Sequence, residues 1–233
     1  MNQLFQKIRL SIFIPMVILN IIGVVAIVST KGGFGDSHYA EKQIGFILFS
    51  FLSAIAIIAI PFEFFKSLAY PFYIFGIGLL LFVAFFGKTV NGAKGWIYLG
   101  PGIPSLQPSE FMKYFLVLAL GKYLMHQESY HRWRDLIIPF LLCAIPMMFL
   151  LKQPDLGSSM IYMPLLFTLL FALGFRLRKI LLLIVLGSIL ILYLWNKTDF
   201  IHPYQKARVM AFIYPEEFKE REAYQLQHSL AAI

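Results

Sequence analysis

The segment "SLQPSEFMKYFLVLALGKYL", residues Ser105–Leu124, joins a helix start to a long apolar run. Gln107 is predicted as the N-cap, Pro108 as the first helical residue and Glu110 as the third. This order suits a helix start, because proline is pre-organised there and an acid faces the positive end of the helix dipole. Lys113 follows about one turn later on the same helix face. The segment therefore places an acid and a base at the mouth of a helix that is oily enough for lipid.

The composition of the chain indicates an integral membrane protein. Its 233 residues are 59% hydrophobic and 14% charged, whereas a soluble domain is about 45–50% apolar and about 25% charged. The net charge of +8 lies in short clusters between apolar runs. Such clusters orient a chain in a membrane, so we expect contact with membrane lipids and none with nucleic acid. Cys143, the only cysteine, lies in an apolar run, which excludes a disulfide framework or a cysteine metal site.

The apolar runs predict an all-α polytopic fold with about seven spans, because a membrane core of roughly 30 Å needs about 20 helical residues. The first run lacks a cleavage signature and is predicted to stay as a signal anchor. The predicted spans are Leu10–Thr30, Ile44–Pro61, Ala69–Gly87, Ser109–Met125, Leu136–Leu151, Ser158–Gly174 and Ile180–Trp195.

The distribution of Lys and Arg predicts a cytoplasmic N-terminus. With this orientation the inner segments carry nine Lys and Arg residues and the short outer segments carry five, as the positive-inside rule requires. Three polar segments then lie outside, and long loops with Gly, Pro and aromatic residues often carry function. These segments are Gly87–Glu110, Lys152–Gly157 and the tail Asn196–Ile233.

The charged residues at two outer helix starts are the first candidates for a site. In "KQPDLG", Gln153 and Pro154 are predicted to repeat the first helix start, with Asp155 next. Glu110 and Asp155 could each serve only as capping acids. Lys113 is harder to explain structurally, since a lysine inside a span costs roughly 2.5–3.5 kcal/mol and usually faces a cavity or a partner. Its structural alternatives are a packing pair with Glu110 or extension to the membrane surface.

Three further residues are weaker candidates. Lys94 and Trp96 lie in the glycine-rich segment "NGAKGWIYLGPG", where a tryptophan can equally be an interface anchor. Arg208 lies between apolar residues of the tail and fits either an anion contact or a structural salt bridge. His126 and His131 lack ligand spacing, so no metal site is predicted. The residues alone thus indicate an outward-facing cavity that suits either an enzyme for a lipid-linked anionic substrate or a transporter.

Three ordered motifs resemble the SEDS family of bacterial cell-wall proteins. They are "NGAKGWIYLGPGIPSLQPSEFMK", "QPDLGSSMIY" and "HPYQKARVMAFIYPEEF", and the last is similar to the outer loop of the RodA branch. The resemblance implies a fold of roughly ten helices in the bacterial inner (cytoplasmic) membrane. About seven of these helices and part of a long extracytoplasmic loop fall within residues 1–233.

The resemblance implies a peptidoglycan glycosyltransferase of the RodA type, which polymerises lipid II in cell elongation and cell-shape control. A class B penicillin-binding protein would be its partner. This chemistry needs a general base for the sugar hydroxyl and cationic stabilisation of the leaving pyrophosphate. No cofactor is defined, and a divalent cation is left open. By position, the family's cavity residues correspond to Glu110, Lys113, Asp155, Gln107, Ser109 and Gln153, and its outer-loop pattern to Arg208 and Gln225.

The sequence departs from the family pattern at its C-terminal end. The acid proposed as catalytic in the family lies in a later block beyond Ile233, so no catalytic residue is assigned. We therefore expect residues 1–233 to be a single, truncated transmembrane domain with an incomplete loop at 196–233, inactive alone. Two alternatives stay open. One is a lipid-linked precursor transporter or flippase, and the other is a non-catalytic membrane scaffold of the elongation and division machinery.

Overall fold

The computed structural model describes residues 10–30, 38–90, 93–100, 105–125, 133–153 and 155–197, together with the single residues 206, 210, 213 and 214. The chain divides into two compact units, residues 1–65 and 66–233. The first unit contains the helices α2 (Leu10–Thr30) and α3 (His38–Ala59), which pack against each other. The rings of Phe13 and Phe51 meet edge to face at 5.9 Å between centroids.

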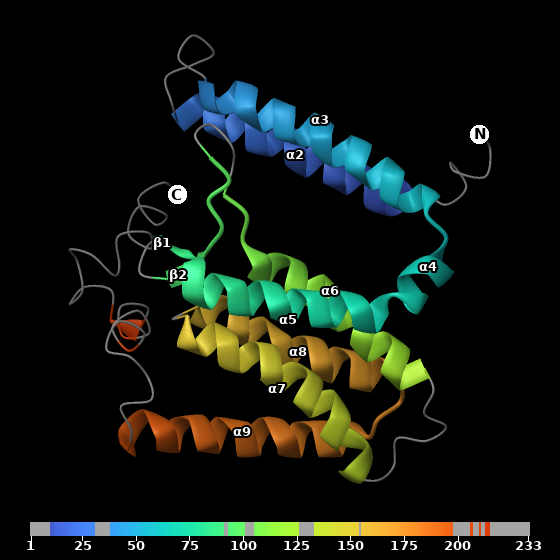
Figure 1. Ribbon diagram of the computed structural model, residues 1–233, viewed down its shortest axis with the longest axis vertical. Coiled ribbons are helices and arrows are strands. Elements are labelled where there is room, and N and C mark those ends of the chain that lie inside the picture. The colour runs from blue at the N-terminus through green and yellow to red at the C-terminus, as the bar shows by residue number, and fades with distance from the viewer. Residues whose placement is uncertain are drawn as a thin grey trace. The chain divides into compact units, whose positions relative to one another are not determined.

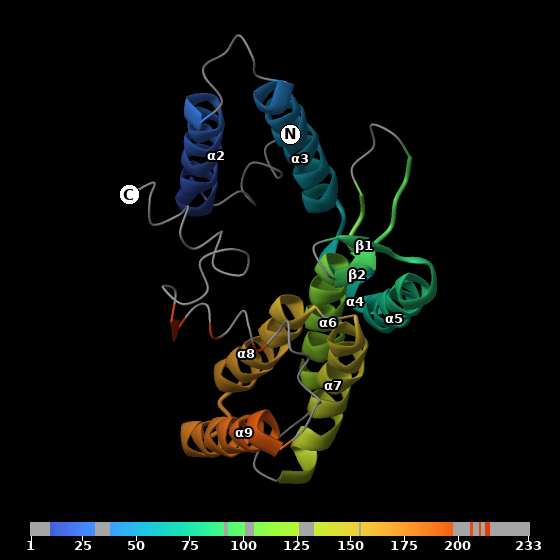
Figure 2. The same cartoon turned by 90° about the vertical axis from the view of Figure 1, so that its left-hand side faces the viewer.

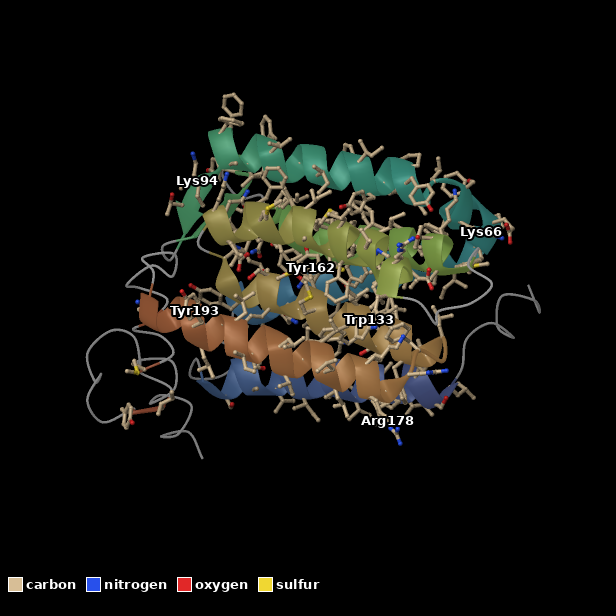
Figure 3. All side chains as sticks on the ribbon, turned by 90° about the horizontal axis from the view of Figure 1, so that it is seen from below. Lys66, Lys94, Trp133, Tyr162, Arg178 and Tyr193 are labelled. Atoms are coloured by element: carbon tan, nitrogen blue, oxygen red, sulfur yellow. The ribbon has the colours of Figure 1, made fainter. Side chains whose placement is uncertain are left out.

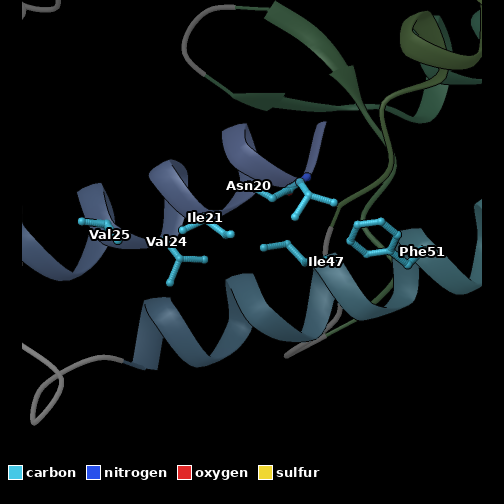
Figure 4. Close-up of a pocket in the computed structure, with 7 residues that line it drawn as sticks. Asn20, Ile21, Val24, Val25, Ile47 and Phe51 are labelled. Atoms are coloured by element: carbon cyan, nitrogen blue, oxygen red, sulfur yellow. The ribbon is translucent and has the colours of Figure 1, made fainter. Parts of the chain in front are cut away.

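A shallow apolar pocket of about 240 Å³ lies between α2 and α3 (Figure 4). It is lined by aliphatic side chains, Phe51 and Asn20. The Asn20 side chain donates to the Met16 carbonyl of its own helix at 2.8 Å. The pocket therefore offers a ligand little polar chemistry, and the candidate residues lie in the second unit.

The second unit is a helical bundle with one hairpin (Figure 1). The short helix α4 (Phe62–Ser67) spans the boundary between the two units. The described elements that follow are α5 (Ala69–Phe86), β1 (Lys88–Val90), β2 (Ala93–Trp96), α6 (Pro108–Met125), the 3₁₀ turn Trp133–Leu136, α7 (Ile137–Lys152), α8 (Leu156–Ala172) and α9 (Leu177–Lys197).

Helix α6 is the centre of this unit and contacts α5, α7 and α8 (Figure 2). Its buried side chains recur every three or four residues, which is the spacing of one helix face. They are Ser109, Met112, Leu116, Ala119, Leu120 and Leu124. Helix α8 buries a matching stripe at Ser159, Tyr162, Leu166 and Leu170. The outer faces remain apolar, as lipid-facing helices require.

All seven predicted spans are helices, and most of their bounds lie within a few residues of the expected ones. Among the described residues, four helices are long and apolar enough to cross a membrane, beginning at Leu10, Tyr39, Ala69 and Trp133. Helix α8 is one residue shorter than the shortest of these, and α6 carries three charged residues. Helix α9 (Leu177–Lys197) is also not among the four, so the deviations from a simple span are not confined to the two helices whose starts carry the candidate site.

The hairpin β1–β2 was not predicted. The strands pair antiparallel, with Lys88 opposite Trp96 and Thr89 opposite Lys94, and a bulge between Lys88 and Thr89. Ile97 then exchanges two backbone hydrogen bonds with Leu106, of 2.8 and 3.0 Å. The sequence does hold a signal for it, the Asn-Gly pair at 91–92 between two short polar runs. The hairpin and the starts of α6 and α8 form one end of the unit, called the hairpin end below.

Gly76 allows α5 and α6 to approach closely. A Cβ atom at this position would lie 2.5 Å from the Met112 sulfur and 2.8 Å from a Phe115 ring carbon. Small residues of this kind let helix backbones pack in membranes, where the hydrophobic effect does not drive association.

We expect Gly76→Val to lower the free energy of unfolding by about 1–3 kcal/mol through overpacking. The matched control is Gly78→Val on the same helix, because a Cβ there meets nothing within 4 Å. Thermal unfolding in detergent measures both variants. Equal melting temperatures for the two would contradict the close approach of α5 and α6.

Candidate functional site

The start of α6 carries the ion pair that its sequence predicts. The Lys113 ammonium donates to both Glu110 oxygens at 2.8 Å. The side chain of Lys113 is 19% exposed and that of Glu110 is 52% exposed. An ammonium has three donors, and the ion pair accounts for two of them. The pair therefore places a largely sheltered cation beneath an exposed carboxylate.

The start of α8 differs from the prediction. Gln153 and Pro154 were expected to repeat the N-cap and first helical positions, but α8 begins at Leu156 and Asp155 is its N-cap. The Asp155 Oδ1 atom accepts a hydrogen bond from the Ser158 N–H at 3.1 Å. Gln153 is instead the C-cap of α7. The physical reason is that aspartate is a preferred N-cap, since its short carboxylate reaches the free amides of the first turn. Pro154 lies outside the described residues.

Asp155 brings the two predicted helix starts together. Its Oδ2 atom accepts from the Gln107 side-chain amide at 3.3 Å and from the Ser109 hydroxyl at 3.5 Å. Gln107 does occupy the position before α6, as predicted, but its side-chain amide contacts Asp155. Ser109 is adjacent in sequence to Glu110. The structure thus gathers Gln107, Ser109, Glu110, Lys113 and Asp155 at the hairpin end.

Gln153 and Lys94 lie at the same end but have internal partners. The Gln153 amide donates to the Leu80 carbonyl of α5 at 2.9 Å, and the residue is only 4% exposed. The Lys94 ammonium donates to the Phe85 carbonyl at 3.0 Å, and Figure 3 shows Lys94 at the hairpin end, away from Trp133. Trp96 is half-buried and ends β2.

Tyr162 contacts the start of α6, although the sequence did not mark it as a candidate. Tyr162 is fully buried on α8, and its hydroxyl donates to the Ser109 carbonyl at 3.5 Å. Figure 3 shows it within the bundle. An aromatic residue inside an apolar run carries no pattern that marks such a contact. Arg208 and Gln225 lie outside the described residues. Among the residues that the structure describes, no three His, Cys, Asp or Glu side chains form a group that could hold a metal ion.

A known protein family matches nearly the whole chain. The family model of the FtsW, RodA and SpoVE cell cycle proteins matches residues 8–233. The chain belongs to this family, the SEDS family. The match covers both charged helix starts and every predicted span. The chain is therefore an all-α, multi-pass membrane protein.

Individual relatives carry the names FtsW and RodA. Proteins named probable peptidoglycan glycosyltransferase FtsW are 33% identical in Haemophilus influenzae, over 95% of this chain and 57% of the relative, and 35% identical in Aliivibrio salmonicida, over 88% and 50%. The rod shape determining protein RodA of Thermus thermophilus matches 79% of this chain and 63% of that one, with 28% identity and a TM-score of 0.62. The chain spans between half and three fifths of the length of the curated relatives that it matches.

One solved structure comes from an assembly. A chain from "Structural coordination of polymerization and crosslinking by a peptidoglycan synthase complex" covers 90% of this chain and 62% of its own length. Its identity is 29% and its TM-score is 0.70. The fold of the described helices is thus shared with a component of a peptidoglycan synthase complex.

Proposed function

We propose that this chain is part of a peptidoglycan glycosyltransferase of the RodA type, which polymerises lipid II during cell elongation. The observation that supports this most is the ion pair of Lys113 and Glu110 beside the Asp155-capped start of α8. The relatives named probable peptidoglycan glycosyltransferase support this reaction. The similarity of the tail segment beginning at His202 to the RodA branch favours elongation. The relatives named FtsW favour a role in division as the second candidate.

The reaction makes two demands on the site. The bond between the donor sugar and its lipid pyrophosphate breaks as the acceptor hydroxyl attacks, and the hydroxyl proton passes to a base. Negative charge builds on the leaving pyrophosphate, so a fixed cation in a poorly hydrated site stabilises the transition state. Lys113 meets the second demand, because it is mostly sheltered and held at a known position by Glu110.

The predicted site residues then take separate roles. Lys113 contacts the pyrophosphate, and Glu110 orients the ammonium. Asp155 supplies negative charge at the start of α8, with Gln107 and Ser109 directed at its Oδ2 atom. The remaining residues are Lys94, Trp96 and Gln153, which lie at the hairpin end, and Arg208 and Gln225, which the sequence assigns to the outer loop.

The site faces the outside of the bacterial cytoplasmic membrane, with the N-terminus inside. The excess of Lys and Arg on the opposite segments supports this orientation. Lipid II would reach the hairpin end from the outer leaflet, and a class B penicillin-binding protein would receive the polymer there. The similarity to a chain of a peptidoglycan synthase complex supports such a partner.

The test is polymerisation of labelled lipid II by the purified protein as its genome encodes it, with and without its class B penicillin-binding protein. We expect a ladder of glycan products on a gel. Flipping of lipid II across vesicles without polymer would favour the transporter alternative. Binding of the partner with neither activity would favour the scaffold.

A further inference from the structure

We propose that Gln153 is a positioning residue, which holds the Asp155 carboxylate opposite the start of α6 and does not itself touch substrate. The inference rests on the proposed function, since it assigns a role within that reaction. It separates two residues that are neighbours in the "QPD" sequence: Asp155 faces the site, and Gln153 acts through it.

The first observation is that Gln153 is buried, and that its side-chain amide nitrogen and its backbone carbonyl are both hydrogen-bonded. Its side-chain amide donates to the Leu80 carbonyl in the middle of α5 at 2.9 Å. Its backbone carbonyl accepts from the Lys94 N–H of β2 at 3.3 Å. With 4% of its surface exposed, the residue has almost no surface that a lipid-linked sugar could reach. Its contacts connect α5, the hairpin and the junction between α7 and α8.

The second observation is that Asp155, two residues after Gln153, is hydrogen-bonded to both helices that meet at this junction. The Asp155 N–H donates to the Leu150 carbonyl at the end of α7 at 3.0 Å, while its Oδ1 atom caps α8 at Ser158. The contacts of Oδ2 with Gln107 and Ser109, at 3.3 and 3.5 Å, are long for hydrogen bonds. A small displacement of the junction would therefore separate Asp155 from the start of α6.

The third observation is that the hairpin supports Gln153 from the other side. The Lys94 ammonium donates to the Phe85 carbonyl in the last turn of α5, where carbonyls lack partners within the helix. The backbone of β2 also lies against Gln107, because a Cβ atom on buried Gly95 would be 3.9 Å from the Gln107 amide nitrogen. Lys94 thus fixes the strand whose backbone N–H donates to Gln153. Lys94 is therefore a second positioning residue for Asp155.

The test is a double-mutant cycle of Gln153→Met with Asp155→Asn, measured as kcat and KM for lipid II polymerisation. Methionine keeps the length of the side chain but removes the donor to Leu80. We expect kcat to fall about 10- to 100-fold with KM within about twofold, as for a misplaced reacting group. In the Asp155→Asn background, Gln153→Met should lower kcat by less than about twofold more, because the two residues act as one unit.

Tyr73→Phe is the matched control. The Tyr73 hydroxyl donates to the Leu142 carbonyl at 2.9 Å, so it also connects α5 to α7 through one hydrogen bond to a backbone carbonyl. Within the part of the chain that the structure describes, the Tyr73 hydroxyl makes no hydrogen bond to Asp155. We expect its removal to leave kcat within about twofold. A rise in KM at unchanged kcat for Gln153→Met, or effects that add fully with Asp155→Asn, would overturn the proposal.

A readout without substrate keeps the inference separate from the proposed function. Gln153→Met should speed hydrogen exchange in the peptide that contains Ser158, whose amide Asp155 caps, and Tyr73→Phe should not. If the wild-type protein makes no polymer, the proposed function fails, and this exchange alone decides the positioning role. If Gln153→Met does not fold, Lys94→Met replaces it in both measurements, with Lys94→Arg expected to restore the wild-type values. Unchanged exchange in Lys94→Met and Gln153→Met would overturn the proposal.

Discussion

In the protein as its genome encodes it, replacing Lys113 by methionine is expected to lower the rate of lipid II polymerisation by about 10²–10³-fold, the usual cost of removing one group that stabilises transition-state charge. The protein should still insert and fold. Methionine removes a cation whose insertion costs roughly 2.5–3.5 kcal/mol, and Glu110 is 52% exposed, so its carboxylate remains hydrated when the lysine is lost. Gel analysis of glycan products measures the rate, and the amount of protein in purified membranes measures insertion.

Lys122→Met on the same helix is the matched control. Lys122 lies at the other end of α6, where its ammonium donates to the Ser67 carbonyl at 3.1 Å and lies over the Tyr70 ring. The substitution Lys122→Met removes the same charge from the same helix, away from the hairpin end. It should leave the polymerisation rate unchanged. Wild-type activity in Lys113→Met would reduce the Lys113–Glu110 pair to a packing element. Equal losses in both lysine variants would point to the charge of α6 as a whole.

The helices could be predicted from the sequence because a membrane span leaves so few choices. Every backbone group in lipid must be satisfied within the segment, so apolar length fixes the element and charges fix its ends. The span Leu10–Thr30 is observed with the predicted bounds. Helical spacing placed Glu110 and Lys113 on one helix face, and of the arrangements that the sequence left open the structure has the ion pair.

The contacts between segments could not be predicted in the same way. The two "QP" sequences look alike, yet Gln107 precedes a helix while Gln153 ends one. The difference arises because Asp155 competes successfully for the N-cap of α8. The contact of the hairpin with Gln153 joins segments about 60 residues apart, and local pattern carries no information on such pairing.

Asp155→Asn separates the two roles that the sequence left open for this acid. Asparagine caps a helix about as well as aspartate, and its amide oxygen can accept from the Ser158 N–H as Oδ1 now does. We therefore expect the melting temperature to change little. The rate of polymerisation should fall about 100-fold, since a site that relies on the negative charge of this carboxylate loses it.

Asp155→Ala provides the comparison on stability, because it removes the cap as well as the charge. It should lower the free energy of unfolding by about 0.5–2 kcal/mol and lose activity to the same extent as Asp155→Asn. Asp135→Asn, in the 3₁₀ turn at the start of α7, removes an acid from the other end of the bundle and should leave the rate of polymerisation unchanged. If Asp155→Asn retained the wild-type rate while Asp155→Ala did not, the carboxylate would be a cap alone. The negative charge of the site would then have to come from Glu110, whose pairing with Lys113 already neutralises most of it.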